Sequence, residues 1–463
     1  MATTYLTRTP GSSSNQIKWT WSAWFKSTGG ASGIGGGTLL GAYTDSNNYT
    51  QIDLSSSIDY YNVTGGSVDG RLTTSRLFRD PAAWYHIVVV WDSANGSATE
   101  RMKLYINGVE ETSFSATTNP TSSLASIMNS TAPQAIGARG DGGAGFFDGE
   151  MAHVHFCDGQ AYAASDFGET DATSGIWVAK SGPSVTYGTN GYFLKFASGA
   201  TLTDSSGEGN NMTLGAGTLT TTKDSPDNNF STWTPLYVPT ANLPTFENGN
   251  TTTIHATATG GWRTMESTIG VSKGKWYWET IGGNSSGHIY CGVCSPEWLE
   301  SGDPASTGPE GEMGFHVAQP SYGVYALNGN MVYSNTSGFG NIESAFTSTA
   351  DENDYWSVYV DLDNHKIYWS INGVIQNSGT GWDLQTGFTY IPCVSLYNST
   401  AAGAKANFGN GTFASTALGG TTYSDDDGIG IFKYSPNYGG AATFDSSAKN
   451  FMALCTTNLA TYG

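Results

Sequence analysis

Two carboxylates near the start of a predicted strand have the residue types of a glycosidase acid pair. Asp148 and Glu150 are separated by one residue, so an extended backbone points both side chains to the same face. Glycosidases place two carboxyl groups about 5–9.5 Å apart on either side of the bond that they cleave. The usual strand signature of sandwich-fold enzymes, Glu-x-Asp-x-x-Glu, is absent here. We therefore expect a protein that is not an enzyme, with glycan depolymerisation as the remaining alternative.

Histidine and cysteine pairs have metal-ligand spacing but lack further partners. His153 and His155 are expected on one strand face with Met151, and no third ligand stands at a persuasive distance, so we interpret both as structural histidines. Cys291 and Cys294 have the spacing of a metal or redox pair, yet no second pair accompanies them and their neighbours are typical of a strand. We interpret them as small buried apolar residues.

Cysteine content and charge exclude several classes of protein. Five cysteines in 463 residues imply no disulfide framework and fit assembly in a reducing cytoplasm. The formal charge of −20 disfavours binding to nucleic acid or to anionic membranes. No segment is apolar for long enough to span a bilayer, and residues 1–10 lack the apolar stretch of a signal peptide. We therefore expect no membrane insertion and no export by the ordinary secretory route.

The elements that must position these residues are short β-strands. The chain is rich in Gly, Ser, Thr, Asn and Tyr and has little of the patterning of long amphipathic helices. A motif of alternating apolar residues that runs into Asn-Gly-Val occurs twice, at 103–109 and at 366–374, and each copy follows an aromatic strand. Asn-Gly in this context is the strongest short-range signal for a β-hairpin. The sequence predicts an all-β protein with two antiparallel β-sandwiches of one architectural type.

The length of the chain requires at least two domains. We predict a first sandwich over 1–222, a linker over 223–250, a second sandwich over 251–412, and a tail over 413–463 that serves packing or attachment. Strand alternation assigns the following residues to the two cores: Trp19, Trp21, Val89, Leu104 and Ile106 to the first, and Trp276, Trp278, Trp356, Val358 and Trp369 to the second.

Residues 1 to about 200 resemble laminin-G/concanavalin-A-like domains. The motifs that carry this resemblance are Trp19-Thr-Trp-Ser-Ala-Trp-Phe-Lys26, Trp84-Tyr-His-Ile-Val-Val-Val-Trp-Asp92, Lys103-Leu-Tyr-Ile-Asn-Gly-Val-Glu110 and Phe147-Asp-Gly-Glu-Met-Ala-His-Val154. Residues from about 262 to 410 resemble a SPRY domain. The corresponding motifs are Gly274-Lys-Trp-Tyr-Trp-Glu279, Tyr290-Cys-Gly-Val-Cys-Ser295, Tyr355-Trp-Ser-Val-Tyr-Val-Asp-Leu362 and Ile367-Tyr-Trp-Ser-Ile-Asn-Gly-Val374. Both families are binding modules.

The order of these modules along the chain is more specific than either alone. Together with the segments at 159–178, 187–211 and 224–230 and the closing residues 453–459, these modules make nearly the whole chain similar to virion structural proteins of tailed phages. This resemblance implies a fibre, appendage or decoration protein displayed on the virion, with adhesion to the host surface or to its glycans as the task. The alternative is a purely architectural capsid decoration protein. Its partners would be other virion proteins, and we expect a homotrimer, because closed symmetric homo-oligomers dominate soluble assemblies.

The resemblance to laminin-G-like domains also implies a calcium site, because such domains often hold one ion at a sandwich rim. Asp45, Asn47 and Asn48 lie on a matching hairpin tip, with Asp141 as the fourth ligand, and hard oxygen ligands suit Ca²⁺. The same residues are also typical of a turn that holds no metal. No other cofactor is expected.

Carbohydrate recognition by such a protein should be shallow and multivalent, since repeated copies compensate for weak single sites. The aromatic residues that are best placed to stack on a sugar are Tyr60, Tyr61, Trp298, Tyr322 and Trp382. The alternative for each of them is ordinary packing against its own loop, because Trp and Tyr are usually largely buried.

Overall fold

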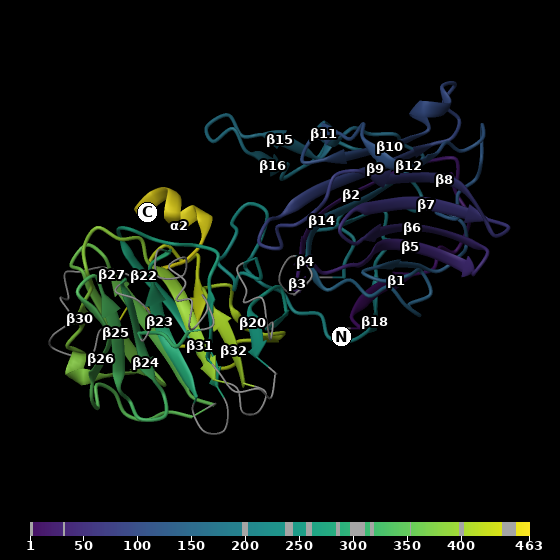
Figure 1. Cartoon of the computed structure of the whole chain (residues 1–463). Helices are drawn as coiled ribbons and strands as arrows, with labels where there is room; N and C mark the ends of the chain where they lie inside the picture. Colours follow the sequence, from purple (N-terminus) through teal and green to yellow (C-terminus); the bar gives the residue numbers. More distant parts are fainter. Residues whose placement is uncertain are drawn as a thin grey trace. The chain divides into compact units, whose positions relative to one another are not determined.

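The computed structural model divides the chain into two compact units (Figure 1). Unit 1 is Met1–Thr28 with Gly33–Thr221, and unit 2 is Gly29–Ser32 with Thr222–Gly463. Strands make up 46% of the residues and helices 4%, so the all-β prediction is confirmed. The described residues are 3–30, 33–196, 202–236, 244–255, 262–283, 288–296, 311–314, 319–351, 353–397, 402–437 and 451–463. Among them, no helix is long and apolar enough to cross a membrane.

Unit 1 is an antiparallel sandwich of two sheets. The eight-stranded sheet has the order β12-β8-β7-β6-β5-β13-β1-β18, and the six-stranded sheet has the order β11-β10-β9-β2-β14-β17. The strands of the unit are β1 (Tyr5–Arg8), β2 (Lys18–Ser27), β4 (Gly33–Ile34), β5 (Gly37–Asp45), β6 (Asn48–Leu54), β7 (Ile58–Thr64), β8 (Ser67–Thr74), β9 (Tyr85–Asp92), β10 (Met102–Ile106), β11 (Val109–Glu110), β12 (Phe114–Thr118), β13 (Gln134–Ile136), β14 (Gly149–Asp158), β15 (Gly168–Thr170), β16 (Trp177–Ala179), β17 (Tyr192–Leu194) and β18 (Thr213–Ala216), with 3₁₀ turns at Ala98–Glu100 and Ala164–Asp166.

The core of unit 1 lies between its two sheets and contains all five residues that alternation assigned to it. Strand β2 is buried along nearly its whole length, although its sequence predicts a half-buried strand. A second apolar layer explains the difference: Val88, Cys157 and Phe193 pack with the segment that carries β15 and β16 on the other side of the six-stranded sheet (Figure 1). The six-stranded sheet is therefore covered on both faces.

A bulge in β14 overturns the predicted common face of Met151 and the two histidines, although both histidine rings stack on Phe193. The register of β14 against β2 shifts between Ala152 and His155, and His153 has a φ of 47°. Met151 consequently packs against the core between the sheets, whereas His155 lies in the outer apolar layer, stacked on Phe193 with 3.9 Å between ring centroids. Met151 and His155 thus point to opposite faces of the sheet.

Unit 2 is also a sandwich of two sheets. Its larger sheet has the order β19-β20-β32-β22-β27-β28-β29, to which β30 and β37 add, and its six-stranded sheet has the order β21-β31-β23-β24-β25-β26. The elements of the unit are β3 (Gly29–Gly30), β19 (Thr245–Glu247), β20 (Thr252–His255), β21 (Trp262–Glu266), β22 (Lys275–Gly283), β23 (Ile289–Cys294), β24 (Ser321–Tyr325), β25 (Met331–Asn335), β26 (Gly338–Glu343), β27 (Tyr355–Asp361), β28 (Lys366–Ile371), β29 (Val374–Ile375), β30 (Trp382–Asp383), β31 (Ile391–Tyr397), β32 (Ala402–Asn407), β33 (Thr412–Phe413), β34 (Thr416–Ala417), β35 (Tyr423–Ser424), β36 (Ile431–Phe432), β37 (Met452–Ala453), a 3₁₀ turn at Asn377–Gly379 and helix α2 (Thr456–Tyr462).

All five residues assigned to the second core are buried there, so the predicted register is confirmed. The segment expected as a linker, 223–250, differs from that prediction, because Trp233 and Phe246 belong to the same core. The tail likewise contributes Met452 and Leu454, and β37 pairs in parallel with β22. Both segments are structural parts of unit 2.

The repeated Asn-Gly motif forms the same turn, with the same side-chain hydrogen bond, in both units. Asn107 and Asn372 have a φ of 49°, and each is followed by a glycine of positive φ, as a type I′ turn requires. The side-chain oxygen of each asparagine also accepts a hydrogen bond from the strand that precedes its hairpin. The donors are the backbone N–H of His86 in β9, at 2.8 Å, and that of Tyr355 in β27, at 3.0 Å. The asparagine therefore forms the turn and also links it to the preceding strand.

Each glycine of the two turns supports an aromatic ring from a later segment. A Cβ on Gly108 would lie 2.6 Å from the ring of Trp177, and one on Gly373 would lie 2.5 Å from the ring of Tyr434. We expect Gly108→Ala to lower the unfolding free energy of unit 1 by about 3 kcal/mol, from left-handed backbone strain and overpacking. Urea unfolding measures this loss. Gly96→Ala is the matched control, because nothing lies within 4 Å of its added Cβ, and an equal effect of both substitutions contradicts the prediction.

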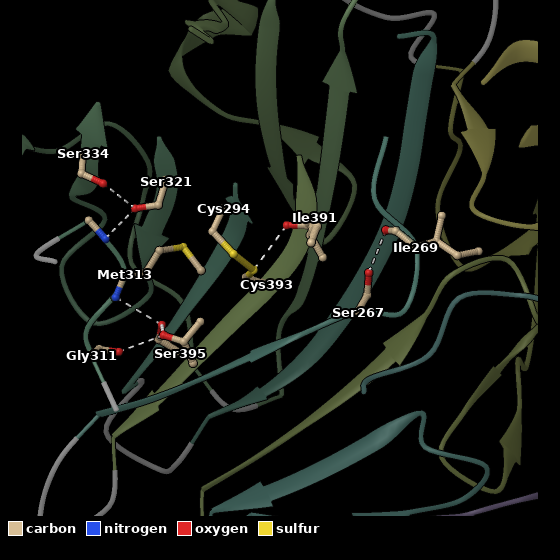
Figure 2. The surroundings of a disulfide bond; sticks show 12 residues. Ser267, Ile269, Cys294, Gly311, Met313, Ser321, Ser334, Ile391, Cys393 and Ser395 are labelled. Atoms are coloured by element: carbon tan, nitrogen blue, oxygen red, sulfur yellow. Dashed lines mark hydrogen bonds between the residues drawn. A yellow bond between two sulfur atoms is a disulfide. The ribbon is translucent and has the colours of Figure 1, made fainter. Parts of the chain in front are cut away.

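A disulfide joins Cys294 of β23 to Cys393 of β31, beside Met313 (Figure 2). The interpretation of Cys294 as an unbonded thiol is therefore wrong. The two cysteines are 99 residues apart in sequence, and the strand register brings them together by pairing Gly292 with Cys393. Cys291 points to the other side of the strand and is a buried free cysteine of the core, as expected.

Candidate functional site

Two of the predicted ligand residues lie in the sandwich cores. Tyr60 is fully buried, and Tyr322 is 2% exposed, with its hydroxyl accepting a hydrogen bond from the backbone N–H of Gln385 at 3.1 Å. Neither ring can stack on a ligand. Trp298 lies outside the described residues.

Trp382 lies in β30 and is only half-buried, but its ring is engaged within unit 2. The ring packs against Tyr333, with centroids 5.0 Å apart, and edge-on against Phe346 at 5.9 Å. These contacts fix it against the second core. Trp382 therefore reads as a packing residue at the rim of the sandwich.

Tyr61 follows the buried Tyr60 and points to the opposite face of the eight-stranded sheet, where it is half-exposed. There it meets Tyr49 of β6, whose ring stands nearly perpendicular to it at 5.8 Å. Tyr49 in turn meets Tyr43 of β5 at 6.0 Å. The three rings therefore form a continuous row across three neighbouring strands.

An arginine closes each end of this row. The guanidinium of Arg139 lies 4.4 Å from the centroid of the Tyr43 ring, and that of Arg71 lies 5.9 Å from the centroid of the Tyr61 ring. Both distances are within the range of cation–π attraction. We call the five residues Arg139, Tyr43, Tyr49, Tyr61 and Arg71 the arginine–tyrosine row.

Strand alternation builds the row. In β6, Tyr49, Gln51 and Asp53 alternate with Thr50, Ile52 and Leu54, and Ile52 and Leu54 lie in the core. The register pairs Tyr43 with Tyr49 and Tyr61 with Arg71. Cross-strand neighbours stand about 5 Å apart, which brings the side chains into contact.

Carboxylates hold the two arginines in place. Arg71 donates to both oxygens of Asp59, at 2.9 and 2.6 Å, and Arg139 donates to both oxygens of Asp141, at 2.7 and 2.8 Å. The hydrogen bond from Arg139 lowers the pKa of Asp141, and the one to Asp59 raises the pKa of Arg71. The arginine ends of the row are therefore oriented before any ligand arrives.

Asp53 fixes the position of Tyr61 in the row. Its carboxylate accepts hydrogen bonds from the hydroxyl of Tyr61 at 2.8 Å and from that of Thr38 at 2.7 Å. Burial, followed by the charge of Asp53, raises the pKa of Tyr61, so its hydroxyl stays protonated. Tyr61 is thereby locked as a donor to its own sheet.

Other polar groups of the row are available to hydrogen-bond a ligand. Within the described part of the chain, the hydroxyls of Tyr43 and Tyr49 and the Nη1 groups of Arg71 and Arg139 have no hydrogen-bond partner in the protein. Their side chains are accessible: Arg71 is 39% exposed and Arg139 30%. A line of hydrogen-bonding tips, held at fixed spacing by rigid rings, can bind a ligand that offers hydroxyl groups along its length.

The predicted calcium ligands are engaged with each other or with the row. The carboxylate of Asp45 accepts hydrogen bonds from the backbone N–H of Asn47 at 2.8 Å and from the side chain of Asn48 at 3.0 Å, which is an ordinary polar turn. Asp141 binds Arg139 instead. Among the described residues, no group of three or more His, Cys, Asp and Glu side chains could hold a metal ion. Calcium binding at this tip stays a prediction.

The other candidates for chemistry have structural partners. Asp148 accepts a hydrogen bond from the hydroxyl of Thr28 at 3.1 Å, and Glu150 is the cross-strand partner of Lys26. The Nδ1 atom of His155 is hydrogen-bonded to the hydroxyl of Tyr187 at 2.9 Å in the outer apolar layer of unit 1. Asp148 and His155 therefore each have a hydrogen-bond partner within unit 1.

One part of the row has a signal in the sequence. Tyr43 and Tyr49 flank the polar hairpin tip symmetrically, so a hairpin there must place the two rings side by side. No sequence pattern indicated Arg139, because it comes from a loop after β13. The position of Arg71 beside Tyr61 follows only from the register in which β8 pairs with β7.

Comparison with known proteins supports the fold of unit 1. Residues 2–165 match the family model Laminin_G_3, described as the concanavalin A-like lectin/glucanases superfamily. The match confirms the laminin-G/concanavalin-A-like resemblance of the first sandwich, and a lectin-like sandwich supports a binding role. A search of curated proteins finds no match.

Solved structures similar to this chain include several SPRY domains. The SPRY domain of human HERC1 is 16% identical, with 38% of this chain and 96% of that chain covered and a TM-score of 0.29. A human SPRY domain is 14% identical, with 34% and 89% covered and a TM-score of 0.24. The PSpry domain of TRIM65 is 12% identical, with 38% and 91% covered and a TM-score of 0.26.

Proposed function

We propose that this chain is a non-enzymatic structural protein of a phage virion that displays lectin-like sandwiches for adhesion to host-surface glycans. The observation that carries the adhesive role is the arginine–tyrosine row, a preorganised line of hydrogen-bonding groups on a half-exposed sheet face. Its shape suits a shallow site. Adhesion then depends on repeated copies, which a homotrimer or another symmetric appendage on the particle supplies.

Two further features support display on the outer surface of a particle. The disulfide between Cys294 and Cys393 is of a kind that persists in oxidising surroundings such as virion surfaces. The formal charge of −20 keeps such a protein soluble and disfavours contact with the packaged nucleic acid. The partners of the chain are, on this proposal, other virion structural proteins and a host-surface glycan.

A glycan array with the full-length protein tests the proposal. We expect retention of the assembled protein on one class of host-surface glycan, no release of new reducing ends, and a mass in native mass spectrometry that is a multiple of the chain mass. Tyr61→Ala should weaken retention at least tenfold, because it removes the ring that links Tyr49 to Arg71 and so breaks the row. If no glycan is retained, the result favours the alternative of a purely architectural decoration protein. The appearance of new reducing ends would show that the protein is a depolymerase.

A further inference from the structure

The ligand class of the row follows from its charge, its direction and the arrangement of its rings. This inference rests on the proposed function, because it concerns the same face of unit 1. We propose that the row binds a segment of an uncharged, linear polysaccharide that lies across the strands, recognised through its hydroxyl groups along several sugar units.

Charge argues for an uncharged ligand. The two arginines of the row are each neutralised by a bidentate aspartate, and Asp53 adds a third carboxylate beneath Tyr61. The row and its partners therefore carry a net negative charge, as does the whole chain. A sulfated or uronic-acid polymer would be repelled by this face, whereas neutral hydroxyl groups can both donate to carboxylates and accept from guanidinium and phenol groups.

Direction argues for an extended ligand. Tyr43, Tyr49 and Tyr61 lie on three neighbouring strands, and the end arginines extend the row beyond them. Neighbouring strands are about 5 Å apart, which is also about the length of one sugar unit in a linear chain. A single terminal sugar would reach one uncommitted tip, whereas a chain that crosses the strands reaches several.

The arrangement of the rings shows which atoms make the contacts. Tyr49 and Tyr61 stand edge to face, and one face of Tyr43 is covered by Arg139, so the rings pack on each other and present their edges and hydroxyls. Recognition therefore comes chiefly from the hydroxyls of Tyr43 and Tyr49 and the Nη1 groups of the arginines. The rings keep these donors at fixed spacing, which lowers the entropic cost of binding.

Isothermal titration of the full-length protein with oligosaccharides of defined length tests this inference. The uncharged probes are linear β-1,4-glucan, α-1,4-glucan and β-1,4-mannan oligomers of two to six units, and the anionic probe is an oligogalacturonate series. For at least one uncharged series we expect affinity to rise about tenfold from two units to four and then to level off, since the row offers a limited number of tips. The anionic series should show no binding.

A double variant tests the assignment of the contacting groups. Tyr43→Phe with Tyr49→Phe removes two hydroxyls and keeps both rings, so the fold is preserved. We expect about a tenfold loss of affinity, the equivalent of two net hydrogen bonds. Tyr423→Phe, at a tyrosine of unit 2 that is 42% exposed, is the control and should change nothing.

The outcomes separate this inference from the proposed function. Glycan retention on the array with equal affinity for two and six units, or with no effect of the double variant, overturns the inference and leaves the proposed function standing. Preference for the anionic series also overturns it. If no saccharide binds and the double variant instead alters the oligomer mass, the row is a contact between copies of the chain, and both proposals fail.

Discussion

Replacing Glu279 with glutamine is expected to lower the unfolding free energy of unit 2 by about 3 kcal/mol. Glu279 is fully buried, and each of its two oxygens accepts two hydrogen bonds. One oxygen accepts from the hydroxyl of Tyr277 at 2.9 Å and the backbone N–H of Tyr434 at 2.6 Å. The other accepts from the side chain of Asn407 at 3.0 Å and the backbone N–H of Lys433 at 2.9 Å.

At pH 8.5, above the pKa of about 7 to which burial raises Glu279, the carboxylate is ionised and accepts from all four donors. A glutamine cannot do so, because its amide nitrogen would face two donors with donors of its own. The lost contacts include one of the two N–H groups that attach the C-terminal segment to β22, because Lys433 and Tyr434 donate to different oxygens of Glu279. We therefore expect hydrogen–deuterium exchange to show faster exchange of the amide of Lys433 or of Tyr434, as well as a lower urea midpoint. Glu247→Gln, at an exposed glutamate of the same unit, is the control. Unchanged exchange at both amides would contradict the role of Glu279 as a clasp.

Acidification from pH 7.5 to pH 5.0 is expected to destabilise unit 1 by about 2 kcal/mol through His86 alone. Burial, with the nearby His153 as a second cause, lowers the pKa of His86 to about 3. The geometry requires a neutral ring, because Nδ1 accepts a hydrogen bond from the indole of Trp177 at 3.0 Å and Nε2 lies 2.9 Å from the hydroxyl of Ser22. Burial also lowers the pKa of His155 far below its ordinary value, which adds to the effect.

The direction follows from proton uptake. An unfolded histidine titrates near pH 6.5, so between pH 6.5 and 3 the unfolded chain binds a proton that the native chain excludes. The stabilising contribution of His86 is therefore complete above pH 6.5 and is lost as the pH falls toward 3. Differential scanning calorimetry at both pH values measures this loss. Replacement of His86 by asparagine should flatten the pH slope of unit 1, whereas replacement of the exposed His365 of unit 2 should not.

Unit 2 provides an internal comparison, because burial raises the pKa of Glu279 to about 7. The native chain therefore holds a proton on this carboxyl between pH 4.5 and 7 that the unfolded chain has released. The resulting stability is present below pH 4.5 and is lost as the pH rises through 7. The contributions of His86 and Glu279 thus have opposite signs over the same pH range, and parallel shifts of both units would contradict the assignment.

The sequence by itself determined the fold class and the inward faces of the main strands. Apolar residues at every second position leave only one face that can be buried between two sheets, and the Asn-Gly turns set the hairpin registers, so the residues assigned to both cores are buried. The same alternation guarantees that one of Tyr60 and Tyr61 points inward. Alternation does not determine whether Tyr60 or Tyr61 points inward. The pairing of β7 with β6 and β8 determines that Tyr60 does.

Only the tertiary structure decided what covers the outer faces of the sheets. Alternation predicts that Tyr277 and Glu279 face water, because they alternate with the core residues Trp276 and Trp278. In the structure, segments far away in the sequence lie over that face, among them Phe230, Phe432 and Phe451. No local pattern records such a contact, since it depends on where a distant segment returns to the sheet. The pairing of Cys294 with Cys393 could not be predicted for the same reason, because it depends on how distant strands pair.

The arginine–tyrosine row combines both kinds of information. The sequence placed Tyr49, Gln51 and Asp53 on one side of a strand and so made an outward polar face certain once the strand existed. The neighbours of Tyr49 come from β5 and β7, and Arg139 comes from a loop nearly a hundred residues later. A site made of single side chains from several strands exists only in the assembled sheet, because hydrogen-bonded pairing, rather than sequence proximity, brings its members together.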